Sequence, residues 1–199
     1  PERGSSLLVL AALVGVLPMA RMAGVAMVVA FAIWTLRCGR LSWPLRLAGI
    51  AIAALPALAW IAYRSLLPIE ESYVEALTLE RALAAFGGWS GLLMQPLQML
   101  RGLAEAFAQR TGTVQIGAAA LVALLAAVGL PSRLRANALD AWFVPIYAGL
   151  VVIWPYPAEI PRLMLVLLPV LLLQAWSGAV RLAELVPRAL PGARHGPLL

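Results

Sequence analysis

The sequence has no lysine and contains only one cysteine, one histidine and one aspartate. A single cysteine, Cys38, excludes an internal disulfide and a cysteine-ligated metal cluster. The histidine, His195, lies in a Pro/Gly/Arg segment typical of a disordered tail, so neither a histidine metal site nor a Ser-His-Asp triad is expected. Glycine-rich phosphate loops, CxxC and HExxH motifs are also missing.

Charge is scarce too, since 12% of the 199 residues are charged and 63% are apolar. A soluble domain has about 45–50% apolar and about 25% charged residues. With a mean hydropathy of +0.91, the chain is therefore predicted to be an integral membrane protein, not a soluble enzyme or a disordered chain. The net charge of +6 comes from arginines spread between apolar runs, which indicates membrane topology and not nucleic-acid binding.

Six uncharged runs approach the roughly 20 apolar residues that a membrane-spanning helix needs. They are Gly4–Ala20, Met22–Leu36, Leu47–Tyr63, Thr111–Ser132, Ala141–Ala158 and Leu163–Val180. We therefore expect residues 1–199 to form a single all-α bundle of about six transmembrane helices. Only Arg21 separates the first two runs, so the pattern leaves open whether residues 4–36 form one span or two.

The placement of arginine predicts the orientation of these spans. If the N-terminus is cytoplasmic, the cytoplasmic segments hold nine arginines and three acids, whereas the external segments hold six of each. The positive-inside rule therefore favours cytoplasmic locations for both chain ends and for the Arg37–Arg46 and Ser132–Asp140 segments. Asp140 is then interpreted as a cytoplasmic loop residue, and residues 186–199 as a disordered cytoplasmic tail.

Residues 64–112 form the longest external segment and are predicted to contain amphipathic helices on the outer membrane surface. Pro96 can begin one of them, and Gly87-Gly88 would join it to a weaker helix upstream. The expected apolar face is Leu97, Leu100, Ala104 and Phe107, and the polar face is Gln98, Arg101, Glu105 and Gln109. Arg101 and Glu105 have the spacing of an i,i+4 ion pair. These helices could equally serve only to cover the bundle.

Two arginines at the predicted outer interface are candidates for binding a lipid phosphate. Arg162 lies between two long apolar runs, with Glu159 nearby, and Arg21 lies between the first two runs. A planar, permanently charged guanidinium is suited to bidentate binding of phosphate. The alternative for Arg162 is an interface anchor whose charge reaches the headgroups, and for Arg21 a turn charge.

Three external carboxylates are candidate acids or ligands of a divalent cation, namely Glu70, Glu71 and Glu159. The adjacent pair Glu70-Glu71 is as readily explained as a solvated loop. We therefore expect either no cofactor or a divalent cation, and assign no metal site.

Two stretches are similar to C-type membrane glycosyltransferases. The first, LPMARMAGVAMVVAFAIWTLRCGRLSWPLRLAGIAIAALPALAWIAYR, has the family's order of Arg21, Gly24, a basic Arg37–Arg46 turn and a helix ending Trp60–Tyr63. The second, VVIWPYPAEIPRLMLVLLPVLLLQA, resembles the family's late aromatic/Pro turn, in which Arg162 and Pro169 match an arginine and a proline. The resemblance covers residues 7 to about 183 and consists mostly of hydrophobic patterns.

The resemblance implies transfer of a sugar from a polyprenyl-phosphate donor on the outer side of a bacterial inner membrane. The family's catalytic acid is an aspartate in an external loop near the N-terminus, whereas the single aspartate here is predicted to be cytoplasmic. The resemblance therefore implies that this chain, which begins with Pro1, is a piece of a longer enzyme. The alternatives are a piece of a secondary transporter or permease, and a membrane assembly protein without catalysis. The expected partners are the donor and membrane lipid, not nucleic acid.

The predicted orientation can be checked with a membrane-impermeant thiol reagent on intact cells. Cys38 lies in the predicted cytoplasmic turn and should remain unlabelled, whereas cysteines introduced between Glu70 and Gln109 should react. Labelling of Cys38 from outside would reverse the assignment.

Overall fold

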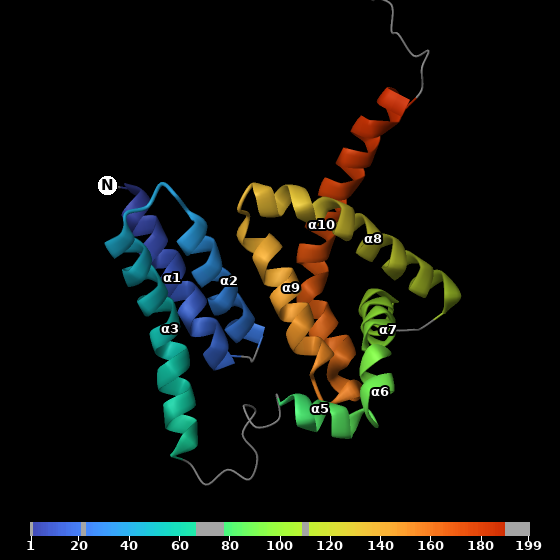
Figure 1. Ribbon diagram of the computed structural model, residues 1–199, viewed down its shortest axis with the longest axis horizontal. Helices are drawn as coiled ribbons and strands as arrows, with labels where there is room; N and C mark the ends of the chain where they lie inside the picture. Colours follow the sequence, from blue (N-terminus) through green and yellow to red (C-terminus); the bar gives the residue numbers. More distant parts are fainter. Residues whose placement is uncertain (1, 21–22, 67–77, 109–111, 190–199) are drawn as a thin grey trace, which may run out of the picture.

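The computed structural model describes residues 2–20, 23–66, 78–108 and 112–189, and in these residues every regular element is helical (Figure 1). The elements are α1 (Glu2–Ala20), α2 (Ala23–Arg37), α3 (Trp43–Ser65), α5 (Leu79–Ala85), α6 (Trp89–Leu93), α7 (Gln95–Ala108), α8 (Thr113–Arg135), α9 (Leu139–Val152), the 3₁₀ turn η1 (Pro157–Glu159) and α10 (Ile160–Ala189). The all-α prediction is confirmed for this part of the chain.

Three described helical segments are long and apolar enough to cross a membrane: Trp43–Tyr63, Thr113–Arg135 and Pro157–Leu185. The apolar segments Gly4–Pro18, Gly24–Arg37 and Leu139–Val152 are shorter. A 14-residue helix is about 21 Å long, whereas the hydrocarbon core is about 30 Å thick. The helices therefore indicate a membrane protein with three candidate spans, where the sequence predicted about six.

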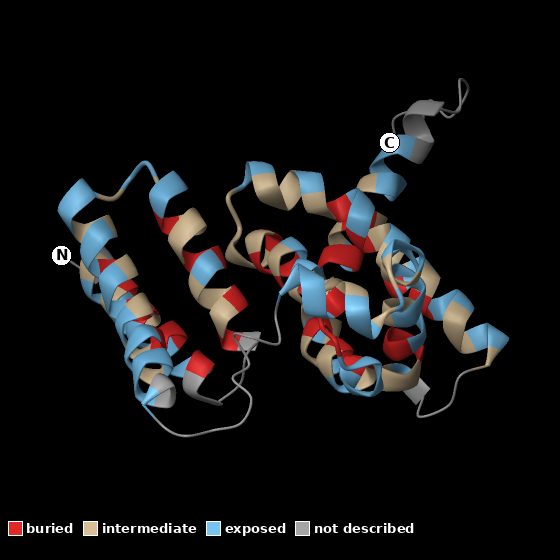
Figure 2. Ribbon diagram, turned by 60° about the horizontal axis from the view of Figure 1, so that its bottom comes forward, coloured by how far each residue is buried: buried red, intermediate tan, exposed pale blue. Residues whose placement is uncertain are grey.

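The outward faces of the long helices carry large apolar side chains. Figure 2 shows the buried residues concentrated where helices meet, with exposed residues along the outer faces. The most exposed apolar residues of α3 and α8 include Leu55, Leu58, Val114 and Leu124. A soluble monomer rarely exposes such continuous apolar surface, so these faces are suited to lipid.

Helices α1, α2 and α3 form an N-terminal three-helix unit. One cluster of its buried residues consists of Leu7, Ala11, Val14, Phe31 and Ala53. A Cβ added at Gly15 would lie 3.0 Å from the carbonyl oxygens of Ile52 and Ala53, so α1 and α3 pack closely there. Residues 4–20 and 23–36 thus belong to two helices that pack against each other, and whether each of them crosses the membrane stays a prediction.

Helices α7 to α10 form the second unit, and its central feature is the crossing of α8 and α10. A Cβ on Gly129 would collide with the carbonyl oxygen of Gln174, and one on Gly178 would collide with that of Leu125. The two backbones are therefore in direct contact, as small residues permit between membrane helices. Around the crossing lies a core that includes Phe143, Tyr147, Ile160, Met164 and Leu167.

The two units meet where α2 packs against α9. Asn137 follows the end of α8 and has a φ of 50°. Its Nδ2 donates to the carbonyl oxygen of Trp34 at 3.1 Å. The Nε1 of Trp142 in turn donates to the Oδ1 of Asn137 at 3.0 Å. The guanidinium of Arg37 lies 5.0 Å from the centre of the Trp142 ring. This chain of contacts fixes one end of the α2–α9 interface.

The connections gather at two opposite ends of the molecule. Figure 1 places the α2–α3 turn, the α8–α9 turn and the C-terminal part of α10 at one end. The last turn of α3, helices α5 and α6, and the start of α10 lie at the other end (Figure 1). This separation agrees with the two sets of loops that the arginine pattern distinguishes. Which end is cytoplasmic stays a prediction.

The predicted helix at Pro96 is confirmed as α7, and the side that it buries within the bundle coincides only in part with the predicted apolar face. Leu103 and Ala104 are buried, whereas Leu97 and Phe107 are 43% and 40% exposed. The reason is that α7 packs against both α8 and α10 and contributes to the core, so two neighbours select the buried face. Helix α7 therefore does more than rest on a membrane surface.

Two further predictions concern the segments next to helices. Gly87-Gly88 does form a joint, with φ of 68° and 102°, but it leads from α5 into the short helix α6 and not directly into α7. The predicted tail is wrong for residues 186–189, because α10 continues to Ala189. The residues directly before this stretch, Arg181 to Leu185, are all good helix formers, and the helix that they form extends past Pro187. Residues 190–199 and most of the predicted upstream amphipathic helix lie outside the described residues.

The glycine crossing predicts a clear effect of adding single methyl groups. Gly129→Ala and Gly178→Ala should each destabilise the bundle by about 1–3 kcal/mol, because the new Cβ meets backbone of the other helix. The control is Gly117→Ala in α8, where a Cβ meets nothing within 4 Å. Thermal unfolding in detergent measures all three, and equal midpoints for Gly129→Ala and Gly117→Ala would contradict backbone contact.

Candidate functional site

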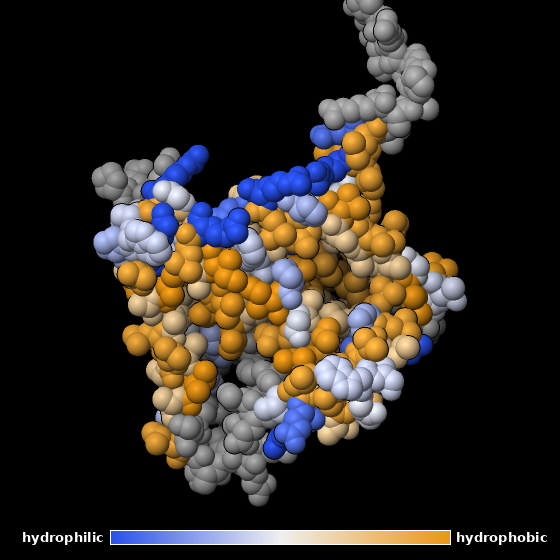
Figure 3. Space-filling model, in the orientation of Figure 1, coloured by the Kyte–Doolittle hydropathy of each residue, from blue (hydrophilic) through white to orange (hydrophobic). Residues whose placement is uncertain are grey.

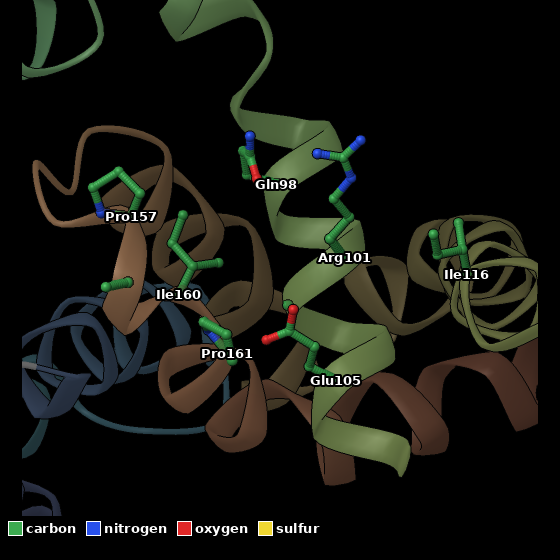
Figure 4. Close-up of a pocket in the computed structure, with 9 residues that line it drawn as sticks. Gln98, Arg101, Glu105, Ile116, Pro157, Ile160 and Pro161 are labelled. Carbon is green, nitrogen blue, oxygen red and sulfur yellow. The ribbon is translucent and has the colours of Figure 1, made fainter. Parts of the chain in front are cut away.

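A cavity of about 580 Å³ lies between α7, the start of α8 and the η1–α10 junction (Figure 4). It belongs to the end of the molecule that the sequence predicts to be external. Its lining residues are Gln98, Arg101, Gly102, Glu105, Ile116, Pro157, Ala158, Ile160 and Pro161. Residues about sixty positions apart in the sequence thus form one site.

Glycine and proline position the walls of this cavity. A Cβ on Gly102 would lie 2.9 Å from Cγ2 of Ile160 and 3.2 Å from the nitrogen of Pro161, so α7 approaches α10 closely at Gly102. Pro157 occupies the first position of η1, where its missing N–H leaves no helical hydrogen bond unmade. The chain therefore turns into α10 directly beside α7.

The polar side chains of the cavity come from one face of α7, at the i, i+3 and i+7 positions Gln98, Arg101 and Glu105. Figure 4 shows the Arg101 guanidinium and the Glu105 carboxylate pointing in different directions. The predicted Arg101–Glu105 ion pair is not formed. Among the described side chains, the one ion pair joins Arg133 to Asp140. Both charges thus remain available to a ligand.

This arrangement suits an amphipathic anion. The guanidinium of Arg101 can donate two parallel hydrogen bonds to a phosphate. The Gln98 amide and the Glu105 carboxylate can bind hydroxyl groups. Ile116, Ile160 and the two prolines supply an apolar wall beside these groups. The site can therefore receive a phosphorylated polar headgroup together with the first part of an apolar chain.

None of the predicted site residues that the structure describes lines this cavity, although two of them lie next to it. Arg162 is exposed and follows the lining residue Pro161, and Glu159 is exposed in η1 directly before Ile160. Neither lines the cavity. Arg21, Glu70 and Glu71 lie outside the described residues. Among described residues no group of three histidine, cysteine or carboxylate side chains could hold a metal ion.

Sequence reasoning missed Arg101 as a site residue. The polar stripe of α7 was the signal available, but its spacing is also that of an ordinary solvated helix face. Only the approach of the η1–α10 junction turns this stripe into the wall of a cavity.

A second polar cluster joins α8, α9 and α10 at the opposite end. Arg133 donates from Nε and NH2 to the two carboxylate oxygens of Asp140, at 2.7 and 2.6 Å. The buried Gln174 donates from Nε2 to the backbone oxygen of Asp140 at 3.2 Å. The Arg133 NH1 lies 3.4 Å from the Ser177 hydroxyl. The interpretation of Asp140 as a loop residue is therefore wrong, because it lies in the first turn of α9, where a negative charge is favourable.

Removing one partner of this cluster should destabilise the fold. Asp140→Asn leaves the partly buried Arg133 guanidinium without a countercharge, and we expect a loss of about 1–3 kcal/mol in detergent unfolding. Glu184→Gln, an exposed acid on α10, is the control and should have little effect. The double variant Arg133→Met/Asp140→Leu should be less destabilised than Asp140→Asn. If the double variant loses as much free energy of unfolding as the single variants Arg133→Met and Asp140→Leu lose together, the two side chains are not coupled.

No protein-family model, curated protein or solved structure matches this chain. The resemblance to C-type membrane glycosyltransferases therefore rests on the residues quoted from the sequence. The functional argument rests on that resemblance and on the α7–α8–α10 cavity.

Proposed function

We propose that this chain is part of an integral membrane glycosyltransferase that takes a sugar from a polyprenyl-phosphate donor. The observation that carries the proposal is the cavity beside α7, in which Arg101 stands next to apolar walls at one end of the apolar helices. The donor's phosphate and sugar would occupy the cavity, while its polyprenyl chain would follow the apolar surface toward the lipid.

The proposal includes a topology of six spans in a bacterial inner membrane, with the cavity on the extracytoplasmic side. Helices α1, α2 and α9 are short for this, but a bilayer can thin locally around short helices at modest cost in free energy. The short helices α2 and α9 pack against each other, which would confine the thinning to one region. The arginine pattern supports cytoplasmic locations for both chain ends.

The residues around the cavity would divide the work of donor binding. Arg101 would bind the phosphate, and Arg162, one residue beyond Pro161, would neutralise it from the rim. Glu105 and Gln98 would bind sugar hydroxyls and hold the anomeric carbon toward the acceptor. Holding the phosphate in this way also stabilises the charge that develops on it as the bond to the sugar breaks.

The reaction also needs a base that takes the proton of the attacking acceptor hydroxyl. Asp140 is unsuited to this role, because it is paired with Arg133 at the end opposite the cavity. The resemblance implies that an aspartate on the external side supplies the base. We therefore assign donor binding, and not proton transfer, to the described residues.

Conservative substitution of the arginines tests the proposal in a complete, active enzyme. Arg101→Lys and Arg162→Lys should each reduce transfer at limiting donor by about ten- to a hundredfold, since lysine keeps the charge but loses the guanidinium fork. Arg81→Lys is the control, because Arg81 is exposed on α5 and does not line the cavity. The measurement is the rate of sugar transfer against donor concentration.

Each outcome has a distinct meaning. An unchanged rate for Arg162→Lys would leave Arg162 as an interface anchor, since lysine can serve equally well in that role. An unchanged rate for Arg101→Lys and also for Arg101→Gln would remove the cavity from donor binding and contradict the proposal.

A further inference from the structure

The end of the molecule opposite the cavity carries an excess of arginine. The described arginine side chains there are Arg37, Arg40, Arg46, Arg133, Arg135 and Arg181. They come from the end of α2, the α2–α3 turn, the start of α3, the end of α8 and the C-terminal part of α10, and the described acids beside them are Asp140 and Glu184. Figure 3 shows hydrophilic residues along this edge, directly above the apolar surface. We call these six arginines the arginine rim.

The cavity end has no such excess. Its described charged side chains are Glu80, Arg81, Arg101, Glu105, Glu159 and Arg162, which give no net charge. The arginine rim, with six arginines and two acids, has a net charge of +4. The excess therefore belongs to one end of the bundle.

Three arginines of the rim are already occupied. Arg133 binds Asp140, Arg46 donates to the backbone oxygens of Leu41 and Leu36 at 2.9 and 3.1 Å, and Arg181 reaches the carbonyl oxygen of Val128 at 3.5 Å. Arg37, Arg40 and Arg135 are exposed, and none of them pairs with a described acid. Their charges are the part of the rim that a ligand can neutralise.

Tryptophans lie beneath two guanidinium groups of the rim. Arg37 is 5.0 Å from the Trp142 ring centre, and Arg46 is 5.1 Å from that of Trp43. Such a contact restrains the guanidinium, and Arg37 remains exposed while it lies over the Trp142 ring. Tryptophan itself favours the headgroup level of a bilayer.

We propose that the arginine rim binds the phosphate groups of anionic phospholipids in the surrounding leaflet. Clusters of arginine at the ends of membrane helices attract anionic headgroups, and exposed guanidinium groups bind phosphate bidentately. Lipid is the partner that fits, because the rim continues directly into the apolar surface (Figure 3), so a bound phosphate places its acyl chains against that surface. The proposal is independent of the transferase reaction at the opposite end.

The test compares two sets of substitutions in the purified chain in neutral detergent. The rim variant is Arg37→Gln/Arg40→Gln/Arg135→Gln, and the matched control is Arg81→Glu/Ser90→Glu, which also lowers the net charge by three but at exposed positions of α5 and α6 that do not line the cavity. Each protein is titrated with phosphatidylglycerol and phosphatidylcholine of identical acyl chains, and bound lipid is read by native mass spectrometry. We expect wild type and control to prefer phosphatidylglycerol at least tenfold, and the rim variant to lose about ten- to a hundredfold of this preference.

Several outcomes would overturn the proposal. These are a wild type without lipid preference, a rim variant that keeps the preference, or a control that loses it equally. Displacement of phosphatidylglycerol by soluble polyglutamate at equal charge would indicate an acidic protein partner instead. If the rim variant fails to fold, Arg40→Gln/Arg135→Gln replaces it, because both side chains are exposed and neither lies over a tryptophan ring. This double variant should lose part of the preference for phosphatidylglycerol, and a folded double variant that keeps the full preference would contradict the proposal.

Discussion

The contact between α8 and α10 at Gly129 and Gly178 is the constraint on which the second helical unit depends. Two helices whose backbones touch near one end diverge toward the other, and Figure 1 shows α8 leaving α10 at a wide angle. Helix α7 fills the space between them, since it packs against both. The cavity remains where α7 does not fill this angle completely, so the site at one end follows from the glycine contact at the other.

Polar contacts reinforce the crossing on the side away from the cavity. Asp140 connects three helices, because its carboxylate accepts from Arg133 of α8 and its backbone oxygen accepts from Gln174 of α10. Ionised groups within a membrane bundle are expensive unless they are paired, and this pair satisfies that condition. The Arg133–Asp140 pair is thereby satisfied within the bundle, whereas Arg101 and Glu105 of the cavity are left for a ligand. This division of charge supports binding at one end and anchoring at the other.

The sequence was a good guide to composition-driven features and a poor one to contacts between helices. The long apolar runs predicted an all-helical chain, Pro96 marked the start of α7, and Gly87-Gly88 marked a joint, because each depends on local chemistry. The sequence did not predict the pairing of Asp140 with Arg133 or the burial of Leu103 of α7 against the neighbouring helices. Both are decided by which helices cross, and a single sequence with degenerate hydrophobic patterns carries little information on crossing. Arg101 was missed for the same reason, since α10 completes its cavity.

Photocrosslinking with a diazirine-bearing polyprenyl-phosphate sugar tests the central claim, donor binding in the cavity, most directly. With the diazirine placed next to the phosphate, the account predicts that crosslinked peptides come from α7 and from the η1–α10 junction, around Gln98–Glu105 and Pro157–Pro161. An excess of unlabelled donor should abolish this labelling. Labelling spread evenly over the apolar helices, or concentrated at Arg37–Arg46, would contradict a donor site in the cavity.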